Sequence, residues 1–277
     1  MIISRTPLRI SFCGGGTDYP QFYNTHGGAV LATSIDKYCY VMLHNGKSWY
    51  TFDLPNKSGL ASSSAYTVGL LRVCSELTNR DIASIATIWE QDKTNGQVGS
   101  QDQFLCAMGG FHHLKFSEHG IKDIPIEQDI VTPLQDYLML FDTNQYRRNG
   151  DIIPSQLDRI KENEKSLIRM GEMVTEGVKL LRLHDYVLFG ELLSETWQLK
   201  RSLSSKVSTP MIDDIYDTAM KSGAMGGKLL GGGGGGFILF MVEPDKQETV
   251  RQALTGLDNV KFRFENEGTK VVYHDNR

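Results

Sequence analysis

A run of six consecutive glycines at residues 231–236 constrains the fold of this chain more than any other feature. A glycine run this dense is usually a flexible linker between independent domains. Here a helical pattern closely precedes the run, and the apolar stretch Phe237-Ile238-Leu239-Phe240, typical of a buried strand, follows it at once. We therefore expect the glycines to form a loop inside one packed unit, with their backbone against a ligand or another loop.

Composition excludes several classes of protein. The 277 residues are 40% hydrophobic with a formal net charge of −4, so a sizeable core is expected and a basic nucleic-acid-binding surface is not. The chain has no apolar stretch long enough to cross a membrane, and its first residues lack the layout of a signal peptide. The four cysteines are scattered, as expected for thiols in a reducing compartment: Cys13, Cys39, Cys74 and Cys106. We expect a cytoplasmic protein that binds neither nucleic acid nor membrane.

Strand and helix patterns predict an α+β fold. The order of the patterns suggests helices packed on mostly antiparallel sheets, without an internal repeat. A polar stretch at residues 127–133 predicts a boundary near residue 130, giving domains of residues 1–130 and 131–277. The predicted strands cover residues 9–12, 29–43, 111–116, 137–141, 237–242, 260–264 and 270–273. The predicted helices cover residues 63–77, 81–93, 157–181, 184–201 and 246–257, with another between Thr209-Pro210 and Gly223.

A second glycine-rich segment follows the first predicted strand. This strand carries Arg9 and runs through Gly14-Gly15-Gly16 into Thr17-Asp18-Tyr19. Glycines let the backbone approach a ligand closely, and Asp18 can accept hydrogen bonds from two neighbouring sugar hydroxyls. Taken in isolation, the segment is more typical of a glycine turn capped by an aspartate.

A third segment, at residues 57–66, places small residues before a predicted helix. It reads Lys-Ser-Gly-Leu-Ala-Ser-Ser-Ser-Ala-Tyr. Backbone N–H groups at the positive end of a helix dipole hold phosphates, and a serine hydroxyl there can ligate the Mg²⁺ that accompanies ATP. The segment lacks the spacing of a Walker A motif, and a serine-rich helix cap is the alternative interpretation.

In their order along the chain, the three segments resemble the signature motifs of the GHMP kinases, over nearly the whole chain. The resemblance implies an N-terminal ribosomal-protein-S5-like α/β domain and a C-terminal ferredoxin-like α+β domain. A further stretch, Val98-Gly99-Ser100-Gln101-Asp102-Gln103, is similar to that of the D-glycero-D-manno-heptose 7-phosphate kinase group. This implies transfer of the γ-phosphoryl group of ATP to that sugar phosphate, with Mg²⁺ as cofactor and a homodimer as one possible assembly. The alternatives are another sugar kinase, similar to galactokinase or fucokinase, or a non-catalytic sugar-binding regulator.

The resemblance also implies roles for individual residues. Asp102, seven residues before Gly109-Gly110, takes the place of the family's catalytic aspartate, and Arg9 that of its arginine. Sugar binding is carried over to Gly16, Thr17, Asp18 and Tyr19, with Arg147 and Arg148 as candidates for the sugar's phosphate and Lys200 and Arg201 as weaker ones. ATP binding is carried over to Ser58, Gly59, Leu60, Ala61, Ser62, Ser63, Ser64, Gly233 and Gly234. The implied metal ligands are Ser63 and Asp92, with Glu90 as the alternative carboxylate and Ser62 or Ser64 as the alternative hydroxyl.

The chain departs from the family pattern at three places. Ala61 replaces the commoner glycine of the phosphate loop, and Leu230 stands where the third motif usually has serine. Between Tyr50 and Thr51 the chain lacks a hairpin and a helix that usually cover the nucleotide side in this family.

Overall fold

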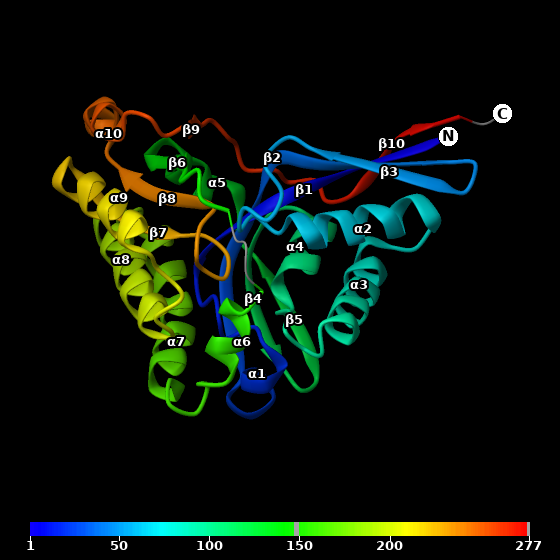
Figure 1. Ribbon diagram of the computed structural model, residues 1–277, viewed down its shortest axis with the longest axis horizontal. Coiled ribbons are helices and arrows are strands. Elements are labelled where there is room, and N and C mark those ends of the chain that lie inside the picture. The colour runs from blue at the N-terminus through cyan, green and yellow to red at the C-terminus, as the bar shows by residue number, and fades with distance from the viewer. Residues whose placement is uncertain (147–149, 276–277) are drawn as a thin grey trace.

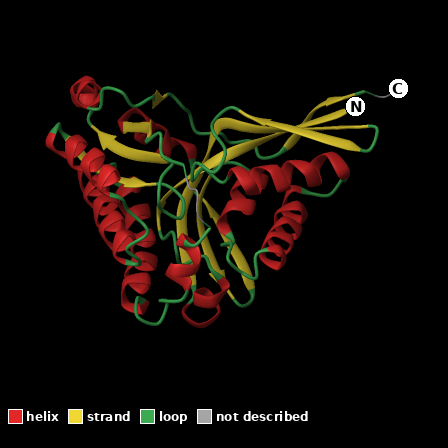
Figure 2. Ribbon diagram, in the orientation of Figure 1, coloured by secondary structure: helices red, strands yellow, loops and turns green. Residues whose placement is uncertain are grey.

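The computed structural model describes residues 1–146 and 150–275 and contains two antiparallel sheets with helices on both sides of the larger one (Figures 1 and 2). The larger sheet has the order β10-β1-β2-β4-β5, and β3 also pairs with β2. Its long central strand pairs with β4 along its first half and with β3 along its second half. The strands are β1 (Ile2–Cys13), β2 (Gly28–His44), β3 (Lys47–Phe52), β4 (Phe111–Ser117), β5 (Gly120–Pro125) and β10 (Lys270–His274).

The smaller sheet has the order β7-β8-β6-β9, and every pair in it is antiparallel. Strand β8, which follows the glycine run, is buried along its whole length, as its uninterrupted apolar sequence predicts. The strands are β6 (Leu138–Asp142), β7 (Ala224–Leu229), β8 (Phe237–Val242) and β9 (Asn259–Val260).

Helices cover the two faces of the larger sheet. On one face, α2 (Ser62–Cys74) packs on β1 and β2 and contacts α3 (Asn79–Lys93) and α4 (Gln101–Met108). On the other side, α7 (Glu164–Arg182) contacts β1 and β2, and α8 (Tyr186–Ser202) contacts both β1 and β7, so this helix pair joins the two sheets (Figure 1). Helix α9 (Pro210–Lys221) packs on β7. The short helices are α1 (Pro20–His26), α5 (Gln128–Val131), η1 (Thr132–Tyr137), α6 (Ile152–Leu157), η2 (Pro244–Lys246) and α10 (Gln247–Ala253).

The main hydrophobic core includes residues of both sheets and of the helix pair between them. Phe12 of β1 stacks on Phe111 of β4 and contacts Phe189 of α8. A second cluster lies between the smaller sheet and α9 and includes Trp197 and Phe240. Two sheets with packed helices confirm the predicted α+β class.

The boundary near residue 130 stays a prediction, and the topology adds one feature to it. The chain returns to the larger sheet at its end, where Phe264 bridges to Ile35 and β10 pairs with β1. The larger sheet therefore contains strands from both ends of the described chain.

The predicted elements differ from the structure at several places. The helix predicted over residues 157–181 is interrupted, because α6 ends at Leu157 and α7 begins at Glu164, with turns between them. The strand predicted at residues 260–264 is shorter, since only Asn259–Val260 and the isolated bridge at Phe264 pair. The predicted start of a helix at Thr209-Pro210 is confirmed, because the Thr209 hydroxyl accepts a hydrogen bond from the backbone N–H of Ile212.

The junction between Tyr50 and Thr51 lies inside a continuous strand. Tyr50 pairs with Val41 and Thr51 with Tyr40, so β3 forms a regular hairpin with β2. In the described part of the chain, no helix is both long and apolar enough to cross a membrane.

Candidate active site

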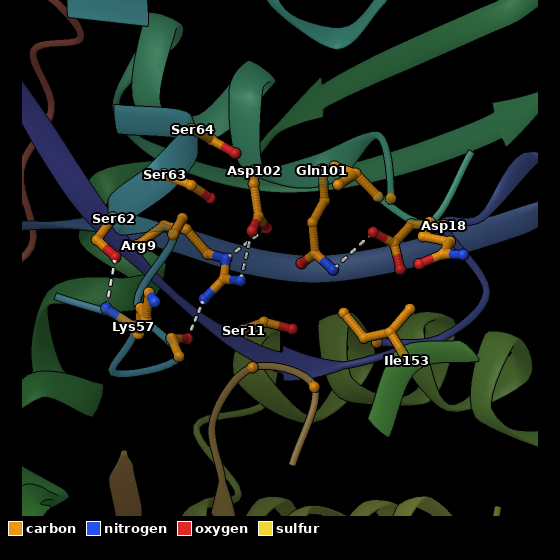
Figure 3. Close-up of a pocket in the computed structure, with 18 of the residues that line it drawn as sticks. Arg9, Ser11, Asp18, Lys57, Ser62, Ser63, Ser64, Gln101, Asp102 and Ile153 are labelled. Atoms are coloured by element: carbon orange, nitrogen blue, oxygen red, sulfur yellow. Dashed lines mark hydrogen bonds and ion pairs between the residues drawn. The ribbon is translucent and has the colours of Figure 1, made fainter. Parts of the chain in front are cut away.

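One cavity of about 550 Å³ brings together the three segments that sequence analysis singled out. The end of β1 and the loop after it form one wall, and the start of α2 and the residues before α4 form another. Figure 3 shows Lys57 and Ser62 at one end of this space and Asp18 at the other, with Arg9 and Asp102 between them. We call these the phosphate-loop end and the acceptor end.

A bidentate ion pair lies at the centre of the cavity. Arg9 Nε donates to Asp102 Oδ1 at 2.8 Å and Nη2 donates to Oδ2 at 2.9 Å, while Nη1 donates to the Gly59 carbonyl at 2.7 Å. Burial alone would lower the pKa of the Arg9 guanidinium, but the charge and hydrogen bonds of Asp102 raise it overall. Arg9 therefore stays charged and fixes the carboxylate of Asp102, which is partly exposed to the cavity.

The phosphate-loop end has the backbone arrangement expected for anion binding. Helix α2 begins at Ser62, and Ala61 before it adopts a left-handed conformation with φ of 64°, so the predicted helix start is one residue late. The Ser62 hydroxyl donates to Asn56 at 2.7 Å, whereas Ser63 is exposed and lines the cavity. Of the other predicted residues, Gly59, Ala61 and Ser64 line the cavity, but Ser58 and Leu60 are buried beside it.

The glycine run is a packed loop, as its sequence context predicts. The Phe237 N–H donates to the Ser58 carbonyl at 3.1 Å, and a Cβ on Gly236 would lie 2.1 Å from that same oxygen. A Cβ on Gly59 would similarly lie 2.5 Å from the Leu230 carbonyl. The glycine loop and the phosphate loop thus touch through their backbones, which side chains at these positions would prevent.

Within the glycine run, Gly231 and Gly232 line the cavity, and the predicted Gly233 and Gly234 do not. The latter two face the protein: a Cβ on Gly233 would clash with Val207, and one on Gly234 with Ile152. The glycines of this run that can contact ATP are therefore Gly231 and Gly232, which corrects the assignment of Gly233 and Gly234.

The acceptor end is built around Asp18. Its carboxylate accepts hydrogen bonds from the Gly16 N–H at 3.1 Å and from Gln101 Nε2 at 2.9 Å. Gly99 makes room for it, because a Cβ there would lie 1.9 Å from Asp18 Oδ2. Burial first, and then the charge of Asp102, raise the pKa of Asp18. Gly16 and Tyr19 also line this end.

Thr17 does not line the cavity, which corrects its assignment to the sugar site. Its buried hydroxyl bonds to the carbonyls of Gly14 and Ala29 and accepts the Ala29 N–H at 3.0 Å. Thr17 therefore holds the glycine-rich loop in shape.

The two glutamines beside Asp102 have roles that sequence analysis did not assign. Gln101 binds Asp18, and Gln103 Nε2 donates to Glu90 at 2.6 Å. Gln101 Oε1 has no hydrogen-bond partner among the described residues, although it is buried and its side chain lines the cavity. The first turn of α4 thus carries Asp102 and, through its two glutamines, holds Asp18 and Glu90. This explains why a Gln-Asp-Gln motif suits this site.

The structure does not support Asp92 as the carboxylate that binds the metal. Neither carboxylate lines the cavity itself, but Asp92 is exposed, whereas the alternative, Glu90, is buried directly behind the phosphate loop. Glu90 accepts hydrogen bonds from Ser64 and Thr67, both at 2.7 Å, and these two side chains line the cavity. Among the described residues there is no cluster of three or more His, Cys, Asp or Glu that could hold a metal.

Of the residues predicted to bind the phosphate of the sugar, only some can be located in the cavity. Arg147 and Arg148 lie outside the described residues. Arg201 pairs with Asp213 at 3.4 Å and does not line the cavity, whereas Lys200 does. Lys228, which sequence analysis did not single out, also lines the cavity, and only its place before the glycine run could have suggested it.

Comparisons with known proteins agree with this geometry. The model of the GHMP kinases N-terminal domain matches residues 32–110, and that of the GHMP kinases C-terminal domain matches residues 178–257. Together they span more than half of the chain. D-glycero-alpha-D-manno-heptose 7-phosphate kinase of Campylobacter jejuni is 27% identical, over 97% of this chain and 98% of its own length. A galactokinase of Pyrococcus furiosus is 26% identical, over 79% of this chain and 70% of its own.

A solved structure shows the same fold. It is described as a D-glycero-D-manno-heptose 1-phosphate kinase from Bacteroides thetaiotaomicron, with a TM-score of 0.78, 22% identity and full coverage of both chains. From the two matched domain models and the site that they enclose, we conclude that this chain belongs to the GHMP kinase family and is a sugar kinase that uses ATP as phosphate donor.

Proposed function

We propose that this kinase transfers the γ-phosphoryl group of ATP to a hydroxyl of D-glycero-D-manno-heptose 7-phosphate. The observation that carries the proposal is the position of Asp102, held by Arg9 between the phosphate loop and Asp18 in one cavity. The similarity to the Campylobacter jejuni heptose 7-phosphate kinase, over nearly the full length of both chains, supports the choice of acceptor.

Positioning and electrostatics account for most of the chemistry in phosphoryl transfer. The Asp102 carboxylate accepts a hydrogen bond from the reacting hydroxyl, orients it and takes its proton as the new O–P bond forms. The bond between the γ-phosphorus and the bridging oxygen breaks at the same time, and ADP leaves with the electron pair. Arg9, beside the transferred group, offsets the charge of the transition state.

Asp18 and Gln101 are suited to hold the sugar. A carboxylate and an amide oxygen accept hydrogen bonds from neighbouring hydroxyls, and both groups lie in the cavity wall at the acceptor end. The retention of Arg9, Asp18, Ser63 and Asp102 in one site favours an enzyme over a non-catalytic sugar-binding regulator.

The residues present fit an Mg²⁺ ion that arrives with ATP. Mg²⁺ prefers oxygen ligands and is usually held by one or two protein groups together with phosphate oxygens and water. The Ser63 hydroxyl at the start of α2 supplies such an oxygen in the cavity wall, and the Glu90 carboxylate of α3 lies just behind it, against the cavity-lining Ser64 and Thr67. The ion would neutralise charge on the β- and γ-phosphates.

Exchanging Glu90 for glutamine is expected to weaken the response to Mg²⁺. Removing a carboxylate beside the ion should raise the Mg²⁺ concentration for half-maximal rate by about 10- to 100-fold. A Mg²⁺ titration of the rate, with a parallel titration of ATP-analogue binding, measures this. The matched control is Asp92→Asn, two residues away and outside the cavity, which should match the wild type. If Asp92→Asn shifts the titration and Glu90→Gln does not, the corrected assignment is wrong.

The acceptor can be identified by measuring ADP release with a panel of sugars, free and phosphorylated. We expect kcat/KM for heptose 7-phosphate to exceed that for galactose, fucose and unphosphorylated heptose by about 100-fold or more, as for sites that bind a charged group. A preference for a free sugar would contradict the proposed acceptor and favour a galactokinase- or fucokinase-like activity, for which the similarity to galactokinases is the observation.

A further inference from the structure

Three polar side chains form a buried group in the cavity wall: Ser11, Lys200 and Lys228. Their exposed fractions are only 4%, 6% and 3%. The mechanism above uses none of them. We propose that this group, called the lysine site below, binds the phosphate group of the acceptor sugar; the proposal rests on the proposed function, which makes the acceptor a sugar phosphate.

Backbone geometry holds the lysine site together. Lys228, near the end of β7, donates from Nζ to the Ser11 carbonyl at 2.5 Å, which links the smaller sheet to the larger one. A Cβ on Gly15 would lie 3.5 Å from Ser11 Oγ and 3.8 Å from Lys200 Nζ. The missing side chain of Gly15 thus leaves space between a hydroxyl and an ammonium group.

The unsatisfied hydroxyl of Ser11 indicates that a ligand binds in this space. It finds no hydrogen-bond partner within the described part of the chain, although its side chain is buried and lines the cavity. A buried hydroxyl without a partner is costly, and a bound oxyanion would supply one. Figure 3 shows Ser11 across the cavity from Asp102 and Gln101.

The charge balance also favours an anion. Two buried ammonium groups near one another are unfavourable: burial first, and then the charge of Lys200, lower the pKa of Lys228 to about 7. Asp102 pairs with Arg9, and Asp18 accepts from Gly16 and Gln101 while its charge also acts on both lysines. A phosphate group carries enough negative charge to offset both lysines.

Position assigns the lysine site to the acceptor and not to ATP. Arg9 contacts the phosphate loop through the Gly59 carbonyl, and Ser11 lies two residues further along β1, toward the glycine-rich loop that holds Asp18. The charge of Lys200 acts on Asp18, whose pKa it lowers against the larger opposing effect of burial. The lysine site therefore adjoins the sugar end of the cavity, while Lys57 lies at the phosphate-loop end.

Separate Lys200→Met and Lys228→Met variants test the assignment, because methionine keeps most of the volume and removes the charge. Each should raise the KM for heptose 7-phosphate by about 10- to 100-fold, as for a lost charge-assisted hydrogen bond, and leave the KM for ATP and for unphosphorylated heptose nearly unchanged. Ser11→Ala should have a smaller effect in the same direction, roughly 2- to 10-fold. Thermal unfolding and ATP-analogue binding verify that the variants are folded.

Two matched variants separate the possible causes. Asp18→Asn should weaken both forms of heptose equally, because it removes a contact to hydroxyls. Lys57→Met, at the other end of the same cavity, should raise the KM for ATP instead. If the Lys200 and Lys228 variants behave like Lys57→Met, the lysines bind the donor phosphates and the proposal is overturned. Equal loss of the two forms of heptose overturns it as well.

A binding experiment keeps the lysine site testable if the proposed acceptor is wrong. Inorganic phosphate is titrated calorimetrically into the full chain saturated with Mg²⁺ and a non-hydrolysable ATP analogue, so that the donor site is occupied. We expect binding to the wild type and a loss of about tenfold or more in each lysine variant. Inactivity on heptose 7-phosphate with this pattern retained would refute only the acceptor. Unchanged phosphate affinity in both variants, or none in the wild type, overturns the lysine site.

Discussion

Replacing Asp102 by asparagine is expected to lower kcat by about 10²- to 10⁴-fold, the range for loss of a positioned acid–base group. Asparagine keeps the size of the side chain but removes the charge that orients the acceptor hydroxyl and receives its proton. Arg9 keeps its hydrogen bond to the Gly59 carbonyl, so the wall of the cavity should remain in place. Steady-state kinetics with saturating ATP and sugar measure the effect.

The fold and nucleotide binding should survive this change. Asp102 lies in the first turn of a short helix, and its side chain faces the cavity and not the core. The thermal unfolding midpoint and the affinity for an ATP analogue are therefore expected to stay near those of the wild type. A kcat within about threefold of the wild type would remove Asp102 from the catalytic role, since such a loss is far below that of a proton acceptor.

Sequence analysis correctly grouped the site residues that lie inside short motifs. Arg9, Asp18 and Asp102 come from three separate segments, and the structure brings them into one cavity. Asp18 follows the glycine-rich loop and Asp102 lies in the first turn of α4, so local backbone geometry positions both, whereas Arg9 lies within β1 and is held by its hydrogen bonds to Asp102 and Gly59. The roles of these residues nevertheless remain proposals that the variants described above test.

The residues that sequence analysis misplaced depend on which way a side chain faces. Thr17 and Asp18 are adjacent, but only Asp18 lines the cavity, because Thr17 turns inward to tie the glycine-rich loop to Ala29. Glu90 and Asp92 are two residues apart on α3, about 200° around the helix axis at 3.6 residues per turn, so only one can face α2. A sequence motif that does not show which side of the helix faces α2 could not distinguish Glu90 from Asp92.

Several elements were also beyond prediction from local pattern. Strand β7 contains Gly226 and Gly227, which lower strand propensity, but packing requires them: a Cβ on Gly226 would lie 1.8 Å from the Gly190 carbonyl of α8, and one on Gly227 would lie 2.4 Å from the Phe240 ring of β8. Because this packing is tertiary, the sequence did not indicate the strand, nor that Lys228 would reach the Ser11 carbonyl on another sheet.

Replacing Arg9 by methionine is expected to lower kcat by roughly 10²- to 10³-fold, as for loss of one fixed group that stabilises transition-state charge. The change removes both hydrogen bonds to Asp102 and the bond to the Gly59 carbonyl, so the carboxylate and the phosphate loop lose their common support. Pre-steady-state and steady-state rates with saturating substrates measure the loss.

Arg5 provides the matched control for this variant. It lies four residues earlier on the same strand and pairs with Glu267 at 3.5 Å, outside the cavity. Arg5→Met should therefore retain wild-type kcat, because it loses only contacts outside the cavity: partly exposed ion pairs with Glu265 and Glu267 and a cation–π contact with Tyr38. Equal losses in the two arginine variants would point to damage of β1 rather than to catalysis.

The double variant Arg9→Met/Asp102→Asn decides whether the pair acts as one unit. If Arg9 works chiefly by holding Asp102, removing both should cost about as much as the worse single change, because the second substitution breaks an interaction that is already lost. Multiplicative losses would instead mean that Arg9 acts on the transferred phosphoryl group independently of Asp102. Because the two side chains share hydrogen bonds at 2.8 and 2.9 Å and Arg9 is also proposed to offset transition-state charge, we expect a loss larger than that of the worse single variant but smaller than the product of the two.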